Sequence, residues 1–167
     1  NVSGHSVIEG IDTNIRWAYD VDGVGTFGVA TLVSWYDPNR TTANQVGVHF
    51  GSIGGGFPEW SAATSFTFNR DALSLLLRWS WDASQEQALY FGGTGANYPD
   101  VEAYDYWTLG GSYDLNDNVT LSGTIDNLLD AEPQVFAGAS AAGQFNVDGS
   151  TQDQLGRSYR VALRLRY

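Results

Sequence analysis

Two glycine-rich stretches are the first candidates for nucleotide chemistry. Gly23-Val-Gly-Thr-Phe-Gly28 matches the G-x-G-x-x-G pattern, which holds a pyrophosphate where a helix begins after the glycines. Here the residues after Gly28 alternate as in a strand, so a hairpin turn is the favoured interpretation. Gly51-Ser-Ile-Gly-Gly-Gly56 lacks the Gly-Lys-Ser/Thr of a phosphate loop and indicates a flexible loop. No cofactor is therefore predicted.

The sequence also gives little support for metal binding or nucleophilic catalysis. Asp20-Val-Asp-Gly23 matches the start of a calcium loop, but the later acidic ligands of that motif are missing. His5 and His49 could share a metal only if distant loops converged, and there is no cysteine to join them. Serine, histidine and aspartate all occur, yet nothing resembles a nucleophile elbow. We predict no catalytic, cofactor-binding or metal-binding residues and no enzyme activity.

The composition narrows the class of protein further. The formal net charge is −11 and lysine is absent, whereas nucleic-acid binding requires clustered basic residues. The 20 glycines and 14% aromatic residues favour strands joined by glycine-rich connections. No apolar run approaches the roughly 18 residues of a membrane-spanning helix. The fold class predicted is all-β.

Alternation with a period of two appears in seven runs, each with one apolar and one polar side. The seven apolar sets are Ile11, Thr13, Ile15, Trp17, Tyr19; Phe27, Val29, Thr31, Val33, Trp35; Trp60, Ala62, Thr64, Phe66, Phe68; Leu73, Leu75, Leu77, Trp79, Trp81; Trp107, Leu109, Gly111, Tyr113; Val119, Leu121, Gly123, Ile125; and Tyr159, Val161, Leu163, Leu165, Tyr167. Charged side chains are absent from these sets and common at the alternate positions. One side of each strand is therefore expected to face water.

The connections between these runs alternate strictly between short and long. Short turns are predicted at 21–25, 69–71 and 115–118, and long polar segments at 37–58, 82–105 and 130–157. Tight periplasmic turns and long extracellular loops are the asymmetry of an outer-membrane barrel. This spacing therefore favours an antiparallel transmembrane β-barrel wall.

Aromatic residues sort toward the ends of the runs. Five of the six tryptophans, here called the tryptophan belt, lie at the ends that meet the long segments: Trp35, Trp60, Trp79, Trp81 and Trp107. Tyrosines and phenylalanines lie near the other ends. Such rings prefer the boundary between membrane and water, because the ring can enter hydrocarbon while its N–H or O–H stays hydrated. A soluble β-sandwich, the alternative reading of the alternation, has no reason to sort its tryptophans in this way.

The last part of the chain resembles the C-terminal end of TonB-dependent receptors. That family typically shows N-L-F-D, a loop, then L-G-R and a final strand that ends in an aromatic residue. This sequence has Asn127-Leu-Leu-Asp130, then Leu155-Gly-Arg157, and ends at Tyr167. It departs from the family with Leu129 where Phe is usual and with Tyr167 where Phe is commoner. Segments 8–12, 57–60 and 103–107 are also similar to the family.

The resemblance implies a barrel of about twenty-two strands filled by an N-terminal plug. Residues 1–167 would form its C-terminal portion, with the plug and the TonB box outside this chain. Seven strands are an odd number, whereas single-chain bacterial barrels have even numbers. We therefore expect further strands from another chain, from more polypeptide or from self-association. The final strand, with Tyr159, Val161, Leu163, Leu165 and Tyr167, would be the signal read by the barrel-assembly machinery, besides facing lipid.

Two groups of residues remain as candidates for contact with a solute. Five arginines fall on the polar side of the strands, where they could line a path for an anionic solute or pair with acids of the plug and neighbouring strands: Arg16, Arg78, Arg160, Arg164 and Arg166. Loop aromatics could stack on a sugar or chelate ring or pack the loops: Phe50, Phe57, Tyr90, Phe91 and Tyr98. The pairing interpretation is favoured for the arginines.

The leading functional hypothesis is part of an outer-membrane active transporter. It would import a scarce solute of the siderophore, cobalamin or oligosaccharide class with energy delivered by the TonB complex. The alternatives are a passive porin or structural barrel, and a soluble carbohydrate-binding sandwich. Both the active transporter and the porin or structural barrel would lie in the cell outer membrane, in contact with lipid.

Overall fold

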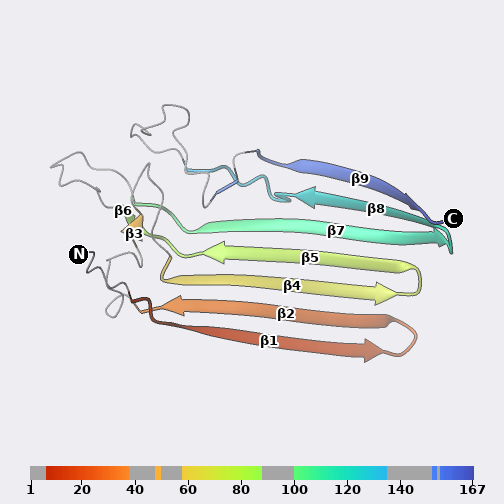
Figure 1. Ribbon diagram of the computed structural model, residues 1–167, viewed down its shortest axis with the longest axis horizontal. Coiled ribbons are helices and arrows are strands. Elements are labelled where there is room, and N and C mark those ends of the chain that lie inside the picture. Colours follow the sequence, from red (N-terminus) through yellow and green to blue (C-terminus); the bar gives the residue numbers. More distant parts are fainter. Residues whose placement is uncertain (1–6, 38–47, 50–57, 88–99, 135–151, 154) are drawn as a thin grey trace, which may run out of the picture.

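The computed structural model describes residues 7–37, 48–49, 58–87, 100–134, 152–153 and 155–167. Its strands are β1 (Gly10–Val21), β2 (Gly25–Tyr36), β3 (Val48–His49), β4 (Trp60–Arg70), β5 (Leu73–Asp82), β6 (Glu86–Gln87), β7 (Tyr104–Asn116), β8 (Val119–Asp126) and β9 (Ser158–Leu165). Seven of them form one antiparallel sheet in the order β1-β2-β4-β5-β7-β8-β9, while β3 and β6 form a short parallel pair (Figure 1). Every strand of the large sheet therefore pairs with its neighbours along the chain.

The register brings the seven apolar sets together on one face, here called the apolar face. Residues directly opposite each other in an antiparallel pair point to the same side of the sheet. One row of opposed residues crosses the whole sheet: Trp17, Val29, Phe66, Leu77, Leu109, Ile125 and Tyr159. The polar alternates form rows on the opposite side, here called the water face. The predicted alternation is thus confirmed in every strand pair, except beside the last turn, where Asn116 lies opposite Val119.

The two ends of the sheet differ as the connection lengths predict. Tight turns at 22–24, 71–72 and 117–118 lie at one edge, the turn end, and the long connections leave from the other, the loop end (Figure 1). Gly23 and Gly25 adopt φ values of 69° and 138°, a region that suits glycine, and the first turn closes with Val24 N–H donating to the Val21 carbonyl. A register shift between Asp114 and Asn116 places a bulge before the last turn.

The apolar face is not the inside of a soluble core. Val101 is the one buried apolar residue among those described, whereas Trp17, Val161 and Leu163 are 54%, 79% and 59% exposed. A sandwich would cover this face with a second sheet. The described strands instead form one large sheet and one pair of two-residue strands. The geometry therefore favours a barrel wall over the sandwich.

The strand ends differ from the predicted sets in three places. β4 continues to Arg70 and β7 begins at Tyr104, so Arg70 and Asp105 extend the apolar face at its turn end and loop end. β9 ends at Leu165 rather than Tyr167, although Arg166 N–H still donates to the Asn118 carbonyl. Charges at the two ends of a lipid-facing surface can reach water by snorkelling.

Among the described residues, no helix has the length and apolar character needed to cross a bilayer.

Candidate functional site

A group of polar residues, here called the loop-end cluster, joins two long connections above the water face. The cluster consists of Tyr104, Tyr106, Gln134, Gln152 and Asp153. Gln134 Oε1 accepts the Glu102 backbone N–H at 2.8 Å, and the Gln134 backbone N–H donates to Gln152 Oε1 at 2.6 Å. The Gln134 side-chain amide donates to the Asp100 carbonyl. The connection after β5 and the connection after β8 are therefore bonded to each other.

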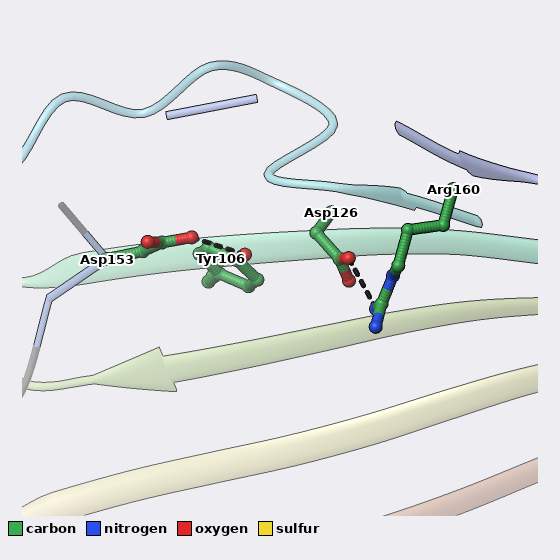
Figure 2. Close-up of polar contacts among 4 residues, drawn as sticks. All are labelled: Tyr106, Asp126, Asp153 and Arg160. Atoms are coloured by element: carbon green, nitrogen blue, oxygen red, sulfur yellow. Dashed lines mark hydrogen bonds and ion pairs between the residues drawn. The ribbon is translucent and has the colours of Figure 1, made fainter. Parts of the chain in front are cut away.

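Strand β7 ties this cluster to the sheet. The Tyr106 hydroxyl donates to Asp153 Oδ2 at 2.7 Å (Figure 2). The Asp153 Oδ1 atom accepts the Leu155 backbone N–H. Tyr104 lies two residues before Tyr106, and their rings are tilted with centroids 6.4 Å apart. The Tyr104 hydroxyl is buried and has no hydrogen-bond partner among the described residues. The result is a pair of neighbouring tyrosines at the loop end, of which Tyr106 bonds the Asp153 carboxylate.

The electrostatics of the cluster follow from burial at the loop ends of β5 and β7, beyond Trp81 and Trp107 on their own strands. Burial raises the pKa of the Asp82 carboxyl above its ordinary value. Burial also raises the pKa of Tyr104. The pKa of Tyr106 is raised first by burial and then by the hydrogen bond from its hydroxyl to Asp153. A space of about 10 Å³, enough for about one water molecule, lies between Asp82, Gln85, Tyr104 and Gln152. The site therefore favours neutral hydroxyl donors over charged groups.

An ion pair lies on the water face, between the loop ends of β8 and β9. Arg160 Nη2 lies 2.6 Å from Asp126 Oδ2, which joins β9 to β8 (Figure 2). This contact agrees with the pairing interpretation of the arginines. Arg16 and Arg78 lie in one row of the water face with Ala30 and Ser65 between them, and within the described ranges neither forms an ion pair. Arg164 lies opposite Thr120 on the same face, and Arg166 follows β9.

The motif residues that support the family resemblance have structural roles at the loop end. Asn127 is fully buried, and its side chain donates to the Ala131 carbonyl and accepts the Ala131 backbone N–H. Asp130 accepts the Arg157 backbone N–H at 3.0 Å. Asn127 and Asp130 have φ values of 53° and 58°, and Gly156 has 69°. Asn127 and Asp130 therefore hold the turn after β8 against the start of β9.

Two residues of the tryptophan belt are anchored by acids at the loop end. Trp35 Nε1–H donates to Glu59 Oε1 at 3.1 Å, and Trp79 Nε1–H donates to Asp105 Oδ1 at 2.6 Å. Belt rings from neighbouring strands meet directly, with centroids 6.1 Å apart for Trp35 and Trp60. An indole with its N–H bonded at the rim and its ring on the apolar surface matches the expected membrane boundary.

Several predicted candidates can be placed and others cannot. Tyr159, Val161, Leu163 and Leu165 lie along β9 on the apolar face, with Tyr167 beyond the end of the strand. His5, the side chain of His49 and the five loop aromatics lie outside the described residues. No group of three acidic, histidine or cysteine side chains that could hold a metal occurs in the described ranges.

The loop-end cluster was not predicted from the sequence. Gln134, Gln152 and Asp153 lie in long segments without alternation, and they approach Tyr106 through contacts up to 47 residues apart in the chain. No period or motif encodes such contacts. The one available signal was the pair of tyrosines that enters β7 directly before the belt residue Trp107.

Solved structures share this fold over nearly the whole chain. A variant of the ferric enterobactin receptor PfeA from Pseudomonas aeruginosa matches 96% of the chain with a TM-score of 0.66 and 19% sequence identity. Another PfeA variant, in complex with enterobactin, gives a TM-score of 0.64 at 18% identity over 96% of the chain. The copper transporter OprC gives 0.56 at 17% identity over 95% of the chain. No protein family and no curated protein sequence matches the chain.

These matches confirm the fold that the sequence motifs implied. The neighbours are TonB-dependent receptors, and the chain has the all-β, antiparallel fold of a segment of their barrel wall. They are a receptor and a transporter rather than enzymes. The chain spans 22% of the PfeA chain and 23% of the OprC chain.

Proposed function

We propose that this chain is part of the barrel wall of an outer-membrane active transporter. The observation that carries the proposal is the apolar face that extends across all seven strands of the sheet and is exposed to solvent. Tryptophans lie along its loop end, and Trp35 and Trp79 are hydrogen-bonded there to acids. In lipid, backbone groups must be paired within a closed sheet, and an exposed apolar face is stabilised by hydrocarbon. The fold match to a ferric enterobactin receptor and a copper transporter supports the transport role.

The strand directions support a larger barrel. β1 and β9 both run from the loop end to the turn end, because the sheet has an odd number of antiparallel strands. Pairing β9 with β1, of this chain or of a second copy, would therefore be parallel. Antiparallel closure needs an odd number of further strands, and residues 1–167 would be the C-terminal portion of a receptor with its plug and TonB box elsewhere. Membrane lipid, the remaining strands, the TonB complex and the barrel-assembly machinery, which would read β9, are the proposed partners.

The transported solute is proposed to belong to the siderophore, cobalamin or oligosaccharide class. We expect the solute to meet the loop end of the water face first, where the loop-end cluster holds the long connections together. A passive porin is the second candidate, because Arg16 and Arg78 are unpaired among the described residues on the water face, as in an open channel.

Uptake by intact cells distinguishes these candidates. Cells that express the whole polypeptide carrying these strands would be given labelled ferric siderophore, cobalamin or oligosaccharide, with and without a protonophore. Active transport predicts that uptake of one solute saturates and stops when the proton gradient collapses or TonB is deleted. Uptake that continues unchanged in both cases would exclude the active transporter and favour the porin. Recovery of the polypeptide in the soluble fraction would exclude both.

A further inference from the structure

A groove crosses the apolar face where two glycines lie opposite each other. Gly111 on β7 pairs with Gly123 on β8, and the missing side chains leave a depression of about 280 Å³. Leu75, Tyr113, Leu121 and Val161 form its walls. Neighbouring rows carry large side chains, so the groove interrupts an otherwise continuous apolar surface. We refer to it as the glycine groove.

The groove lies toward the turn end of the sheet, and a cation lies on the neighbouring strand, opposite one of its wall residues. Leu73, which also lines the groove, pairs with Tyr113 on one side and with Arg70 on the other. Arg70 therefore occupies the same face and the same row as the groove wall. Its contact with Asp71 is 3.7 Å long between side chains that are 56% and 90% exposed, so solvent screens this pair strongly. The guanidinium remains available to a stronger anionic partner.

We propose that the glycine groove binds one acyl chain of a phospholipid whose phosphate pairs with Arg70. A phospholipid carries a long apolar acyl chain next to an anionic headgroup, and the protein presents an apolar groove whose wall residue Leu73 lies opposite the Arg70 cation. Arginine binds phosphate through several donors at once. The inference rests on the proposed function, because the apolar face must lie in a bilayer for the lipid to reach it.

Gly123 allows the groove to be filled without disturbing the sheet. A Cβ atom added at Gly123 would meet only the Arg160 carbonyl oxygen, at an ordinary 3.7 Å. A leucine there would extend into the groove. Gly110 is the matched control, because an added Cβ would lie 3.9 Å from the Leu76 Cβ atom and the larger side chain would extend over the water face.

The test counts retained phospholipid. The whole polypeptide carrying these strands would be folded into vesicles of phosphatidylglycerol and phosphatidylethanolamine, extracted and washed with detergent, and examined by native mass spectrometry. Gly123→Leu is expected to lower the occupancy of one bound phospholipid about tenfold, because the leucine fills the groove and several methylene groups of the acyl chain lose their contacts with it. Arg70→Gln is expected to lower it about fivefold. Gly110→Leu and Arg164→Gln, both on the water face, are expected to retain the lipid.

Three results would overturn the inference. One is equal lipid retention in all variants. Another is loss of lipid in Gly123→Leu but full retention in Arg70→Gln, which would leave an apolar contact without headgroup recognition. A third is a change of oligomeric mass in Gly123→Leu, which would assign the groove to a second copy of the chain. Each of these results leaves the transport proposal intact if uptake still depends on the proton gradient, whereas a polypeptide that stays in solution without detergent defeats both.

Discussion

At the scale of single residues, buried polar groups explain the family motif better than any contact with a solute. Asn127 is fully buried and makes two hydrogen bonds to Ala131 around a left-handed backbone turn. Asparagine is suited to this position, because it tolerates positive φ and its amide offers both a donor and an acceptor. The resemblance to the receptor family at this position therefore reflects a structural requirement.

We expect Asn127→Ala to lower the free energy of unfolding by about 1–3 kcal/mol, because the Ala131 N–H and carbonyl lose their partners in a buried place. Equilibrium urea titration of the protein folded in vesicles measures the change. Asn118→Ala, at an exposed turn position, is the control and is expected to change little. Equal effects of the two substitutions would show that the buried amide bonds are not important.

The Asp82 carboxyl predicts a pH dependence. Burial raises its pKa in the folded protein above the ordinary value of 3.8, so the folded state binds its proton more tightly than the unfolded state does. This group therefore favours folding in acid, and its contribution is lost as the pH rises through the folded pKa. Asp82→Asn keeps the shape but removes the charge.

Urea titrations between acidic and neutral pH would compare Asp82→Asn with the unsubstituted chain. The substitution is expected to stabilise the protein near neutral pH, and the gain should vanish in acid, where the carboxyl is protonated. Asp12→Asn, in the same row but exposed, is the control. A gain that does not depend on pH would contradict the burial explanation.

At the scale of elements, the tight turns show a repeated device. Thr26 donates to Asp20 at 3.0 Å across the first hairpin, and Thr120 donates to Asp114 at 2.5 Å across the third. In both hairpins the two residues are opposed in the register, on the water face beside the turn. In each hairpin an aspartate carboxylate on one strand accepts a hydrogen bond from a threonine hydroxyl on the other. This bond joins the strand ends on the water face and leaves the apolar face unchanged.

The first turn also depends on two glycines in different ways. A Cβ at Gly25, where φ is 138°, would lie 2.6 Å from the Asn69 carbonyl oxygen of β4, whereas a Cβ at Gly23, where φ is 69°, would meet nothing within 4 Å. Gly23→Ala is expected to cost about 1–2 kcal/mol from backbone strain alone. Gly25→Ala should cost more, since the strand pair β2–β4 must also shift.

Urea titrations in vesicles would measure both glycine variants side by side. Hydrogen exchange of the Asn69 region would report whether the β2–β4 pairing opens in Gly25→Ala. If Gly23→Ala were the more damaging change, close packing against β4 would not be the reason for glycine at position 25.

At the scale of the whole molecule, the two faces of the sheet belong to different solvents. Leu76 and Leu77 are neighbours on β5 but point to opposite faces, with Leu77 opposed to Phe66 and Leu109 at the middle of the apolar face. A charge in the lipid-facing middle of a barrel wall has no water nearby, whereas a charge on the inner wall does. This pair of positions tests the membrane assignment directly.

Leu77→Arg is expected to destabilise the protein folded in vesicles, lowering its free energy of unfolding by about 2–4 kcal/mol. Leu76→Arg should lower it much less, because its side chain projects toward the aqueous side. Urea-dependent folding of the whole polypeptide into vesicles, followed by tryptophan fluorescence, gives both values. If Leu76→Arg proved the costlier substitution, the faces would have to be exchanged.

Much of this architecture could be read from the order of residues alone. The two-residue period predicted which side chains share a face, because successive side chains of a strand point to opposite sides. The alternation of short and long connections predicted the meander, because two-residue turns such as 117–118 join only adjacent antiparallel strands. The position of the tryptophans at the strand ends predicted the tryptophan belt along the loop end.

The tertiary structure alone decided the register, the strand ends and the site. Arg70 and Asp105 joined the apolar face only because pairing with neighbouring strands extends β4 and β7 past the periodic runs. The loop-end cluster and the glycine groove arise from contacts between strands and connections that are remote in the chain. Local patterns determine the conformation of a strand, but which remote residues meet depends on how all seven strands align.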